Sequence, residues 1–221
     1  GARRTAEEFG RTFPGVTVRT SAAGEVLDRV AAERSLVIAT PGAEPVADGG
    51  YGAALLVDGW AMLGRADLRA SEETLRRWLN AAALVRPGSA GGRVVVLADA
   101  SLRPVQALVR WDPRGHAERE FGERVGLGFP PATVFAELVG EEAAVDEFVG
   151  SARFPSEAQL LGPVPVTRSR RENGPSVVRA LIRAPRPWAA GLAEGLREAQ
   201  GVRSARKLPP VRVRIDPQEI A

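Results

Sequence analysis

The chain has 221 residues, of which 44% are hydrophobic and 26% are charged, as is usual for a folded protein of one large or two ordinary domains. Cysteine is absent and His116 is the single histidine, which excludes disulfides and thiolate metal sites and argues against a zinc site or a histidine-based triad. The net charge is +3, but residues 112–152 hold three arginines and nine acids, whereas residues 153–214 hold thirteen basic residues and four acids, a candidate footprint for an anionic partner.

Helix and strand patterns alternate through the first half of the chain. Apolar residues at helical spacing predict helices over residues 5–13, 24–33 and 67–84. Short apolar runs predict strands over residues 16–20, 35–40, 51–59 and 93–99. Continuous apolar strands that alternate with helices are typical of a mostly parallel sheet covered on both faces, so the first half is predicted to have an α/β fold.

The pattern changes near residue 112, which predicts a domain boundary there and domains at 1–112 and 113–221. The second domain shows a polar helix, a strand, an amphipathic helix, a β-hairpin, a helix and a final alternating strand, at 115–131, 133–140, 141–153, 164–185, 188–200 and 211–216. Asn173-Gly174 supplies the tight turn of the hairpin. This order of elements predicts an open α+β sandwich.

Few residues suggest catalysis. Asp58 ends an apolar strand, where open α/β sheets place ligand-binding residues, although an ordinary strand-end aspartate gives the same pattern. His116 has no carboxylate partner evident in the sequence and is expected at the surface or at the start of a helix. The Gly-rich stretch GSAGG (88–92) follows a helix instead of opening one, so it lacks the context that binds phosphate and is interpreted as a turn.

The hairpin is a better candidate for a binding site, because it is rich in arginine. The candidate DNA-binding residues are Arg168, Arg170, Arg171, Arg179, Arg183 and Arg186. By the two-residue period of a strand, Arg168 and Arg170 share one face of the first strand, and Arg179 and Arg183 share one face of the second. Arginines on a sheet surface can contact phosphates without reading bases, and no aromatic residues for base stacking are interleaved. The alternative is a solvated sheet face without a ligand.

Several motifs, in a consistent order, resemble one family. GARRTAEEF (1–9) is similar to its G-T-E-R-x-E-E-E-L stretch, and DLRASE (67–72) is close to its D-F-R-A-S-E, the most specific single match. HAEREFGERVGLGFPP (116–131), LGPVPV (161–166) and VRIDPQEI (213–220) resemble later segments of that family. On these residues, the chain resembles the C-terminal part of the primosomal protein N′ (PriA) family of replication-restart helicases.

The resemblance implies that residues 1–112 form most of the second RecA-like lobe of a superfamily 2 helicase, with a mostly parallel sheet. It also implies that residues 113–221 form an α+β domain, similar to a ribosomal-protein-S10 subdomain, that contributes binding of single-stranded DNA. The family binds ATP and zinc, and these cofactors are expected from regions before Gly1, with none held within this chain.

Two motifs that the family uses for ATP depart from its pattern. The alignment that starts at DLRASE places Leu84 and Pro87 where the family's Q-V-A-G-R-A-G-R has arginines that contact ATP phosphates. Arg86 is one residue out of register, a rotation of about 100° on a helix. The family's T-Q-M-x-x-K-G-H keeps only Thr40. Losing an arginine finger lowers the rate on the order of a thousandfold, so the resemblance implies a degenerate motor of the actinobacterial type.

We therefore expect a replication-restart primosome protein that binds forked or single-stranded DNA and directs primosome assembly without helicase activity. Its expected partners are DNA, primosome proteins and single-stranded-DNA-binding proteins. No membrane partner is expected, because no apolar run approaches the length of a membrane-spanning helix. We expect a cytoplasmic, nucleoid-associated monomer. Two alternatives remain open: an active ATP-dependent 3′-to-5′ DNA helicase that uses Arg86, and a scaffold for primosome partners that does not bind DNA.

Overall fold

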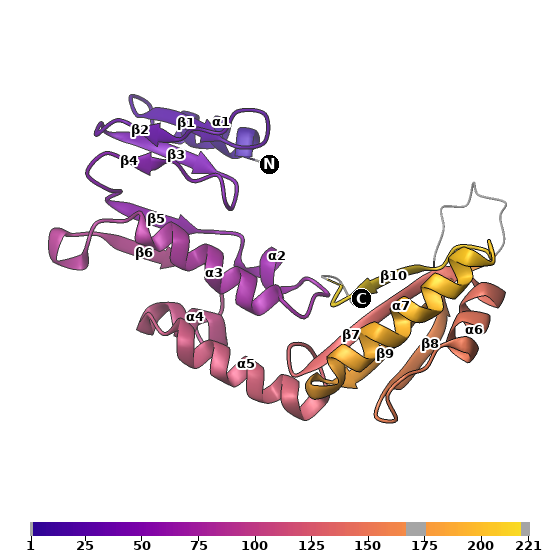
Figure 1. Ribbon diagram of the computed structural model, residues 1–221. Coiled ribbons are helices and arrows are strands. Elements are labelled where there is room, and N and C mark those ends of the chain that lie inside the picture. The colour runs from indigo at the N-terminus through magenta and orange to yellow at the C-terminus, as the bar shows by residue number, and fades with distance from the viewer. Residues whose placement is uncertain (1, 167–175, 218–221) are drawn as a thin grey trace. The chain divides into compact units, whose positions relative to one another are not determined.

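The computed structural model describes residues 2–166 and 176–217 (Figure 1). The chain forms two compact units, residues 1–117 and residues 118–221. Helix α5 (Pro113–Leu127) contains the division between them. Each unit has its own sheets and its own cluster of buried hydrophobic side chains.

The first unit opens with one helix and two pairs of parallel strands. Helix α1 (Ala2–Thr12) precedes strand β1 (Thr17–Ser21), which pairs in parallel with β3 (Ser35–Ala39). The two-residue strands β2 (Arg29–Val30) and β4 (Val46–Ala47) also pair in parallel. The helix and the two longer strands that the sequence pattern predicted for this region are confirmed, to within a few residues at their ends.

The helix predicted over residues 24–33 is wrong, because this segment turns and then contributes β2. Gly24 has a φ of +101°, a left-handed conformation that an α-helix does not contain. The hydroxyl of Ser21, which is fully buried, accepts a hydrogen bond from the backbone N–H of Leu27 at 3.0 Å. This local bonding holds the backbone in a turn at a place where apolar spacing alone favoured a helix.

The rest of the first unit combines two parallel strands with three α-helices and a short 3-10 helix. These elements are β5 (Ala53–Leu56), α2 (Gly59–Leu63), α3 (Ala70–Ala83), η1 (Gly88–Ala90), β6 (Arg93–Val96) and α4 (Arg103–Arg110). Leu75 and Trp78 of α3 pack with Val105 and Leu108 of α4 in a buried cluster. The same cluster covers one face of the β5–β6 pair.

The mixed α/β class is confirmed, but the parallel strands form separate two-stranded sheets instead of one large sheet. Strands β5 and β6 have four residues each, and Leu56 and Val96 face the α3–α4 cluster. Their other face carries Leu55 and Val95, whose side chains are about half exposed. Within residues 2–117, these short pairs bury one face at most, whereas the predicted sheet would be covered on both.

The second unit contains a four-stranded antiparallel sheet and two helices, and confirms the predicted α+β arrangement (Figure 1). Its elements are β7 (Thr133–Glu141), α6 (Glu142–Ser151), β8 (Gln159–Pro165), β9 (Val177–Pro185), α7 (Ala189–Ala205) and β10 (Arg212–Ile215). The strand order is β10-β7-β9-β8, so the chain follows the β-α-β-β-α-β path of ferredoxin-like folds.

Strands β8 and β9 form the predicted hairpin, with a first strand that lies earlier than expected. Strand β8 begins at Gln159 instead of residue 164, and its pairing with β9 shifts register between Leu161 and Val164. At Gly162-Pro163, where the register shifts, the sequence lacks the regular alternation of apolar and polar residues that is typical of a strand. The predicted turn at Asn173-Gly174 lies outside the described residues.

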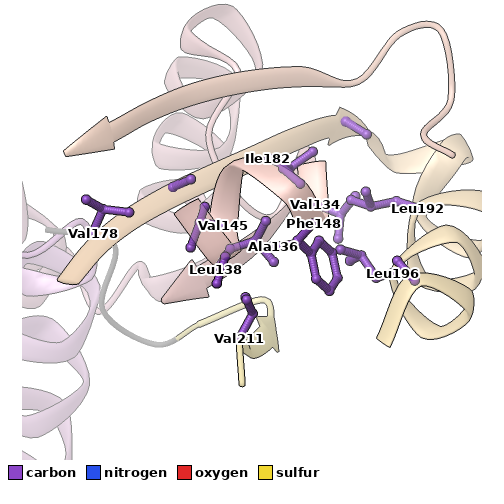
Figure 2. Close-up of a cluster of buried hydrophobic side chains, with 14 residues drawn as sticks. Val134, Ala136, Leu138, Val145, Phe148, Val178, Ile182, Leu192, Leu196 and Val211 are labelled. Carbon is purple, nitrogen blue, oxygen red and sulfur yellow. The ribbon is translucent and has the colours of Figure 1, made fainter. Parts of the chain in front are cut away.

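The core of the second unit lies between one face of the sheet and the two helices, as Figure 2 shows. Strands β7 and β9 contribute alternate residues, which the register places side by side: Val134, Ala136, Leu138, Val178, Ala180, Ile182 and Ala184. Phe148 of α6 and Leu192 and Leu196 of α7 close this core. Burial of each large side chain contributes about 1.5–3 kcal/mol, so the helices are firmly held on this face of the sheet.

Candidate nucleic-acid interface

In the described part of the second unit, α6 and α7 both pack on the core face of the four-stranded sheet, and neither covers the other face. Residues of β9 alternate between buried and half-buried, and the half-buried set includes Arg179 and Arg183. On β10, Arg212 and Arg214 are exposed. We call this helix-free surface, defined by Arg179, Arg183, Arg212 and Arg214, the arginine face.

The strand register places these arginines on a common face. Val139 of β7 pairs with Arg179 of β9 on one side and with Arg212 of β10 on the other. Two residues earlier on β7, Glu137 pairs with Arg214. Neighbouring strands lie about 4.8 Å apart, and alternate residues along a strand lie about 7 Å apart. The backbone of Arg212 is therefore about 10 Å from that of Arg179 and about 7 Å from that of Arg214.

At one end of the arginine face, hydrogen bonds hold the arginine side chains. Arg183 Nε donates to Gln159 Oε1 at 2.9 Å across the β8–β9 hairpin. Arg186, in the 3-10 helix η2 (Arg186–Trp188), donates from Nη1 to Asp216 Oδ2 at 3.2 Å. Asp216 Oδ1 also accepts from the backbone N–H of Phe135 at 3.2 Å. The charge of Arg186 is thus paired at the end of the sheet, beyond the arginine face.

The side-chain contacts of the other three arginines differ from those of Arg183 and Arg186. Within residues 2–166 and 176–217, none of Arg179, Arg212 and Arg214 forms an ion pair or a side-chain hydrogen bond. A guanidinium that donates to no protein group keeps its five N–H donors for a ligand. The planar fork of an arginine matches the oxygens of a phosphate group. These three side chains are therefore the best-placed candidates for phosphate contacts.

The described part of the arginine face has no exposed aromatic ring. Phe135 points to this side of β7, but Phe129 stacks on it with ring centroids 6.4 Å apart, and Phe135 is only 1% exposed. Trp188 is about half exposed but belongs to η2, which follows β9 and lies outside the sheet. Proteins that stack nucleic-acid bases use exposed rings for this purpose. The face therefore offers cationic hydrogen-bond donors without a stacking platform.

A single carboxylate lies in the middle of the arginine face. Glu137 is 7% exposed, although its neighbour in the register on β10 is the exposed Arg214. Its negative charge offsets part of the positive potential around it, because opposite charges at such short range attract even when partly solvated. Glu141 of β7 lies on the same face, two residues beyond Val139, so the described strands place four arginines and two glutamates there.

The structure brings together part of the predicted DNA-binding set and adds to it. Arg179 and Arg183 lie on one face, as the two-residue period predicted, and Arg186 lies at its end. The three remaining predictions fall outside the described residues: Arg168, Arg170 and Arg171. Sequence reasoning missed Arg212 and Arg214, although the alternation of VRVRID already placed them on one face of a strand.

The turn between α3 and β6 contains the residues that align with the arginine motif by which the family contacts ATP: Leu84, Arg86 and Pro87. Leu84 caps the C-terminal end of α3, and its carbonyl accepts from Tyr51 N at 2.9 Å. The backbone N–H of Arg86 donates to Tyr51 O at 2.9 Å. Pro87 precedes η1, which confirms that GSAGG forms a turn instead of opening an α-helix. Leu84 thus ends α3, and Pro87 leads into the turn.

The Arg86 side chain lies along the backbone of two glycines. A Cβ atom at Gly52 would lie 2.8 Å from Arg86 Nη2, and one at Gly50 would lie 3.0 Å from Arg86 Cγ. Within the described residues, Arg86 has no carboxylate partner. Thr40 follows β3, and its backbone N–H donates to Ser21 O at 3.0 Å. The residue after Thr40, Pro41, accepts a hydrogen bond at 3.4 Å from Arg77 of α3.

Neither of the other two chemical candidates forms a recognisable catalytic group. Asp58 precedes α2, and its carbonyl accepts from Met62 N at 3.0 Å without a side-chain cap. His116 lies in the first turn of α5 as expected, but it is buried and not at the surface, and its Nε2 lies 3.1 Å from Ser71 Oγ.

Among the described residues, no cluster of His, Asp and Glu side chains could hold a metal ion. The same residues include no helix of the length and apolarity needed to cross a membrane.

Comparison with known proteins relates this chain to one family. Residues 126–218, which include all four strands of the antiparallel sheet, match the family model described as the primosomal protein N C-terminal domain. The chain is 51% identical over 226 residues to the probable replication restart protein PriA of Mycobacterium leprae (strain TN), an alignment that covers 100% of this chain and 35% of that protein. Over its whole length, the chain is thus similar to the C-terminal part of a replication restart protein PriA.

A second PriA relative, from Mycobacterium tuberculosis (strain CDC 1551 / Oshkosh), is 50% identical over 233 residues, with coverage of 100% of this chain and 36% of the relative. The chain therefore spans about a third of the length of the curated PriA relatives it matches, and corresponds to their C-terminal part. A solved DUF3240 family protein from Shewanella baltica shares 20% identity over 39% of this chain and 89% of that chain. Its TM-score is 0.26, too low to indicate a shared fold.

Proposed function

We propose that the chain acts within a replication-restart primosome protein, as the part that binds forked or single-stranded DNA through the arginine face. The single observation that carries this proposal is that the guanidinium groups of Arg179, Arg212 and Arg214 have no protein partner among the described residues and lie on the sheet face opposite α6 and α7. This sheet lies within the region that matches the primosomal protein N C-terminal domain. Binding of DNA would direct the assembly of primosome and single-stranded-DNA-binding proteins at the fork.

We also propose that this protein does not unwind DNA with ATP. In a helicase, an arginine finger stabilises the charge that develops on the transferred phosphoryl group. Leu84 and Pro87 carry no charge, and Arg86 lies along Gly50 and Gly52. These residues do not fit the phosphate-binding role of the family motif. The first unit would keep the second RecA-like lobe as a scaffold, which its parallel strand pairs and α-helices support without the full sheet.

The test of DNA binding is the affinity of the full chain for forked DNA, measured by fluorescence anisotropy over a range of salt concentrations. Replacement of both Arg179 and Arg212 with Glu should lower the affinity at least tenfold at moderate salt. It should also reduce the slope of log affinity against log salt concentration by the amount expected for about two lost phosphate contacts. The matched control reverses Arg197 and Arg206, which belong to α7 and its C-cap on the opposite side of the sheet. Equal losses in the two double variants would contradict the assignment of the arginine face.

The rival function is an active 3′-to-5′ helicase that uses Arg86. The deciding measurement is ATP hydrolysis by the full-length protein with and without single-stranded DNA. We expect no stimulation by DNA, whereas stimulated hydrolysis that Arg86→Ala abolishes would favour the helicase. A scaffold that does not bind DNA predicts instead that wild-type protein shows no affinity for forked DNA at moderate salt, while partner binding persists.

A further inference from the structure

We infer that the middle of helix α5, residues 117–122, is a hinge between the two compact units, and that Gly122 lowers the stability of the helix there. The division between the units falls inside this helix, between Ala117 and Glu118. Boundaries between compact units usually fall in exposed linkers, whereas here one continuous helix crosses the boundary. The inference concerns the connection between the units and does not depend on the proposed binding of DNA.

The first turn of α5 is held by the first unit. Asp112 Oδ1 accepts a hydrogen bond from the backbone N–H of Gly115 at 2.8 Å, which satisfies one of the free donors at the start of a helix. His116 is 2% exposed, and its Nε2 lies 3.1 Å from Oγ of Ser71 on α3. A Cβ atom at Gly115 would overlap the Asp112 carboxylate, so this glycine has a packing role. The turn is therefore fixed to α3.

The last turn of α5 is held by the second unit. The backbone N–H of Phe129 donates to the carbonyl of Arg124 at 2.9 Å, and Gly128 has a φ of +66°, a combination that ends a helix. Thr133 Oγ1 at the start of β7 donates to the carbonyl of Gly128 at 2.9 Å. Arg124 Nη1 also donates to the carbonyl of Pro130 at 3.4 Å. This end of α5 is therefore fixed to the sheet.

The stretch between these two ends has little packing. Along α5, all of which the structure describes, His116 is the one buried residue, and residues 117–119 and 121–123 are exposed. Helix α7, by contrast, has five buried residues spread along its length. Most of the stability of a helix in a protein comes from the packing of one face. Exposed ion pairs add little to this, although three exposed charged residues of the stretch have polar partners: Glu118, Arg119 and Glu123.

Gly122 weakens this stretch further and has no packing role. A Cβ atom at Gly122 would meet no atom of the described residues within 4 Å. Glycine is less favourable in a helix than any residue except proline, because it loses the most backbone freedom when it is ordered. Gly195 of α7 differs, since a Cβ atom there would overlap the carbonyl of Arg153. The glycine at 122 therefore lowers the cost of bending or opening the helix without improving any contact.

A hinge at this position lets the two units change their relative orientation while each stays folded. Opening of the turn at 118–122 breaks a few backbone hydrogen bonds, and water can replace them because the stretch is exposed. Hinges are typically a few residues that absorb backbone rotation between rigid parts. The arginine face would turn with the second unit and keep its strand pairing.

The first test is hydrogen exchange of the full chain. Amides of residues 119–123 should exchange at least about a hundredfold faster than those of residues 196–203 in α7. Gly122→Ala should slow the exchange in α5 about fivefold, because alanine is favoured over glycine in a helix by about that factor. Gly201→Ala is the matched control, since a Cβ atom at Gly201 also meets no atom of the described part within 4 Å but lies in the packed α7. It should leave exchange in α5 unchanged.

The second test measures the distance between the units by double electron–electron resonance. Because the chain has no cysteine, spin labels can be attached at Arg34→Cys and Glu198→Cys, two exposed positions in different units. The distance distribution should be broad with Gly122 in place, narrower with Gly122→Ala, and unchanged with Gly201→Ala.

Three results would overturn the hinge. The first is protection of the amides in the middle of α5 equal to that in α7. The second is one narrow distance distribution in all three labelled proteins. The third is slower exchange in Gly122→Ala without any narrowing, which would locate the motion between the units outside α5.

Discussion

Arg203 Nη1 lies 2.9 Å from Glu147 Oε2, and this ion pair joins helix α7 to helix α6 on the core side of the sheet. Arg203 Nη2 also donates to the carbonyl of Pro209 at 2.9 Å, and the guanidinium lies 6.0 Å from the centroid of the Phe148 ring. The Arg203 side chain is 4% exposed. One buried arginine thus connects both helices and the segment that leads into β10, the strand that carries Arg212 and Arg214.

Replacement of Arg203 with alanine should lower the free energy of unfolding of the second unit by about 2–4 kcal/mol, because it removes two hydrogen bonds to a buried charge and leaves a void. The matched change Arg197→Ala removes an exposed i,i+3 pair with Glu194 and should cost no more than about 0.5 kcal/mol. Hydrogen exchange of the β7 and β9 amides measures the opening of this unit. Similar protection in the two variants would contradict the structural role of Arg203.

Glu73 should make the first unit less stable in acid. Hydrogen bonds from Arg76 at 2.7 Å and from Arg77 at 2.6 Å lower the pKa of Glu73 from 4.5 to about 2. Because the folded pKa is depressed, the stabilisation is complete above pH 4.5 and is lost as the pH falls towards 2. Since the side chain is 32% exposed, solvent screening limits its contribution to about 1 kcal/mol.

The measurement is urea unfolding of wild type and Glu73→Gln at several pH values between 6 and 2.5, followed by hydrogen exchange of amides in α3. The variant should be less stable than wild type near pH 6 by about 1 kcal/mol and equally stable at the acid end. A constant difference across this range would rule out titration of Glu73 as the cause.

Glu137→Gln should raise the affinity of the chain for single-stranded DNA by about two- to fivefold at low salt, because it removes a negative charge from among the arginines. The gain should shrink as salt is added, since screening weakens the repulsion that the glutamate exerts on phosphates. Glu194→Gln changes the same charge on α7, on the opposite side of the sheet, and should leave affinity unchanged. If both variants gain equally, net charge and not the arginine face determines binding.

Gly92→Ala should destabilise the first unit by about 2 kcal/mol or more, because the added Cβ would overlap the carbonyl of Arg86. Gly88→Ala is the control, since a Cβ at Gly88 meets no atom within 4 Å. Thermal unfolding monitored by circular dichroism compares the two. A stable Gly92→Ala variant would show that the turn carrying Arg86 can rearrange.

The sequence pattern correctly predicted elements whose structure depends mainly on the residues within the element itself. In Val177–Pro185 the two arginines are four residues apart, so the shared face of Arg179 and Arg183 could be predicted from period two, and the burial of the strand alternates accordingly. The error at residues 24–33 has another origin, because a hydrogen bond from Leu27 to Ser21, which lies outside the predicted helix, overrides the apolar spacing.

The candidate site was only half predictable for a related reason. Arg212 and Arg214 show a clear alternation, but nothing local indicates that β10 pairs with β7 and so faces the same side as Arg179. The tether of Arg183 to Gln159 likewise depends on the shifted register between β8 and β9. Cross-strand pairings of this kind depend on the folded topology and leave little local signal in the sequence.

The absence of an exposed ring on the described arginine face has a kinetic consequence for the proposed DNA binding. A strand held by its phosphates has nearly the same interaction energy after each one-nucleotide step, because every step presents an equivalent phosphate to Arg179, Arg212 and Arg214. Proteins bound in this way slide along nucleic acid without dissociating. We expect the bound protein to diffuse along single-stranded DNA until a structure such as a fork junction stops it, so that arrest, and not base sequence, selects where it stays.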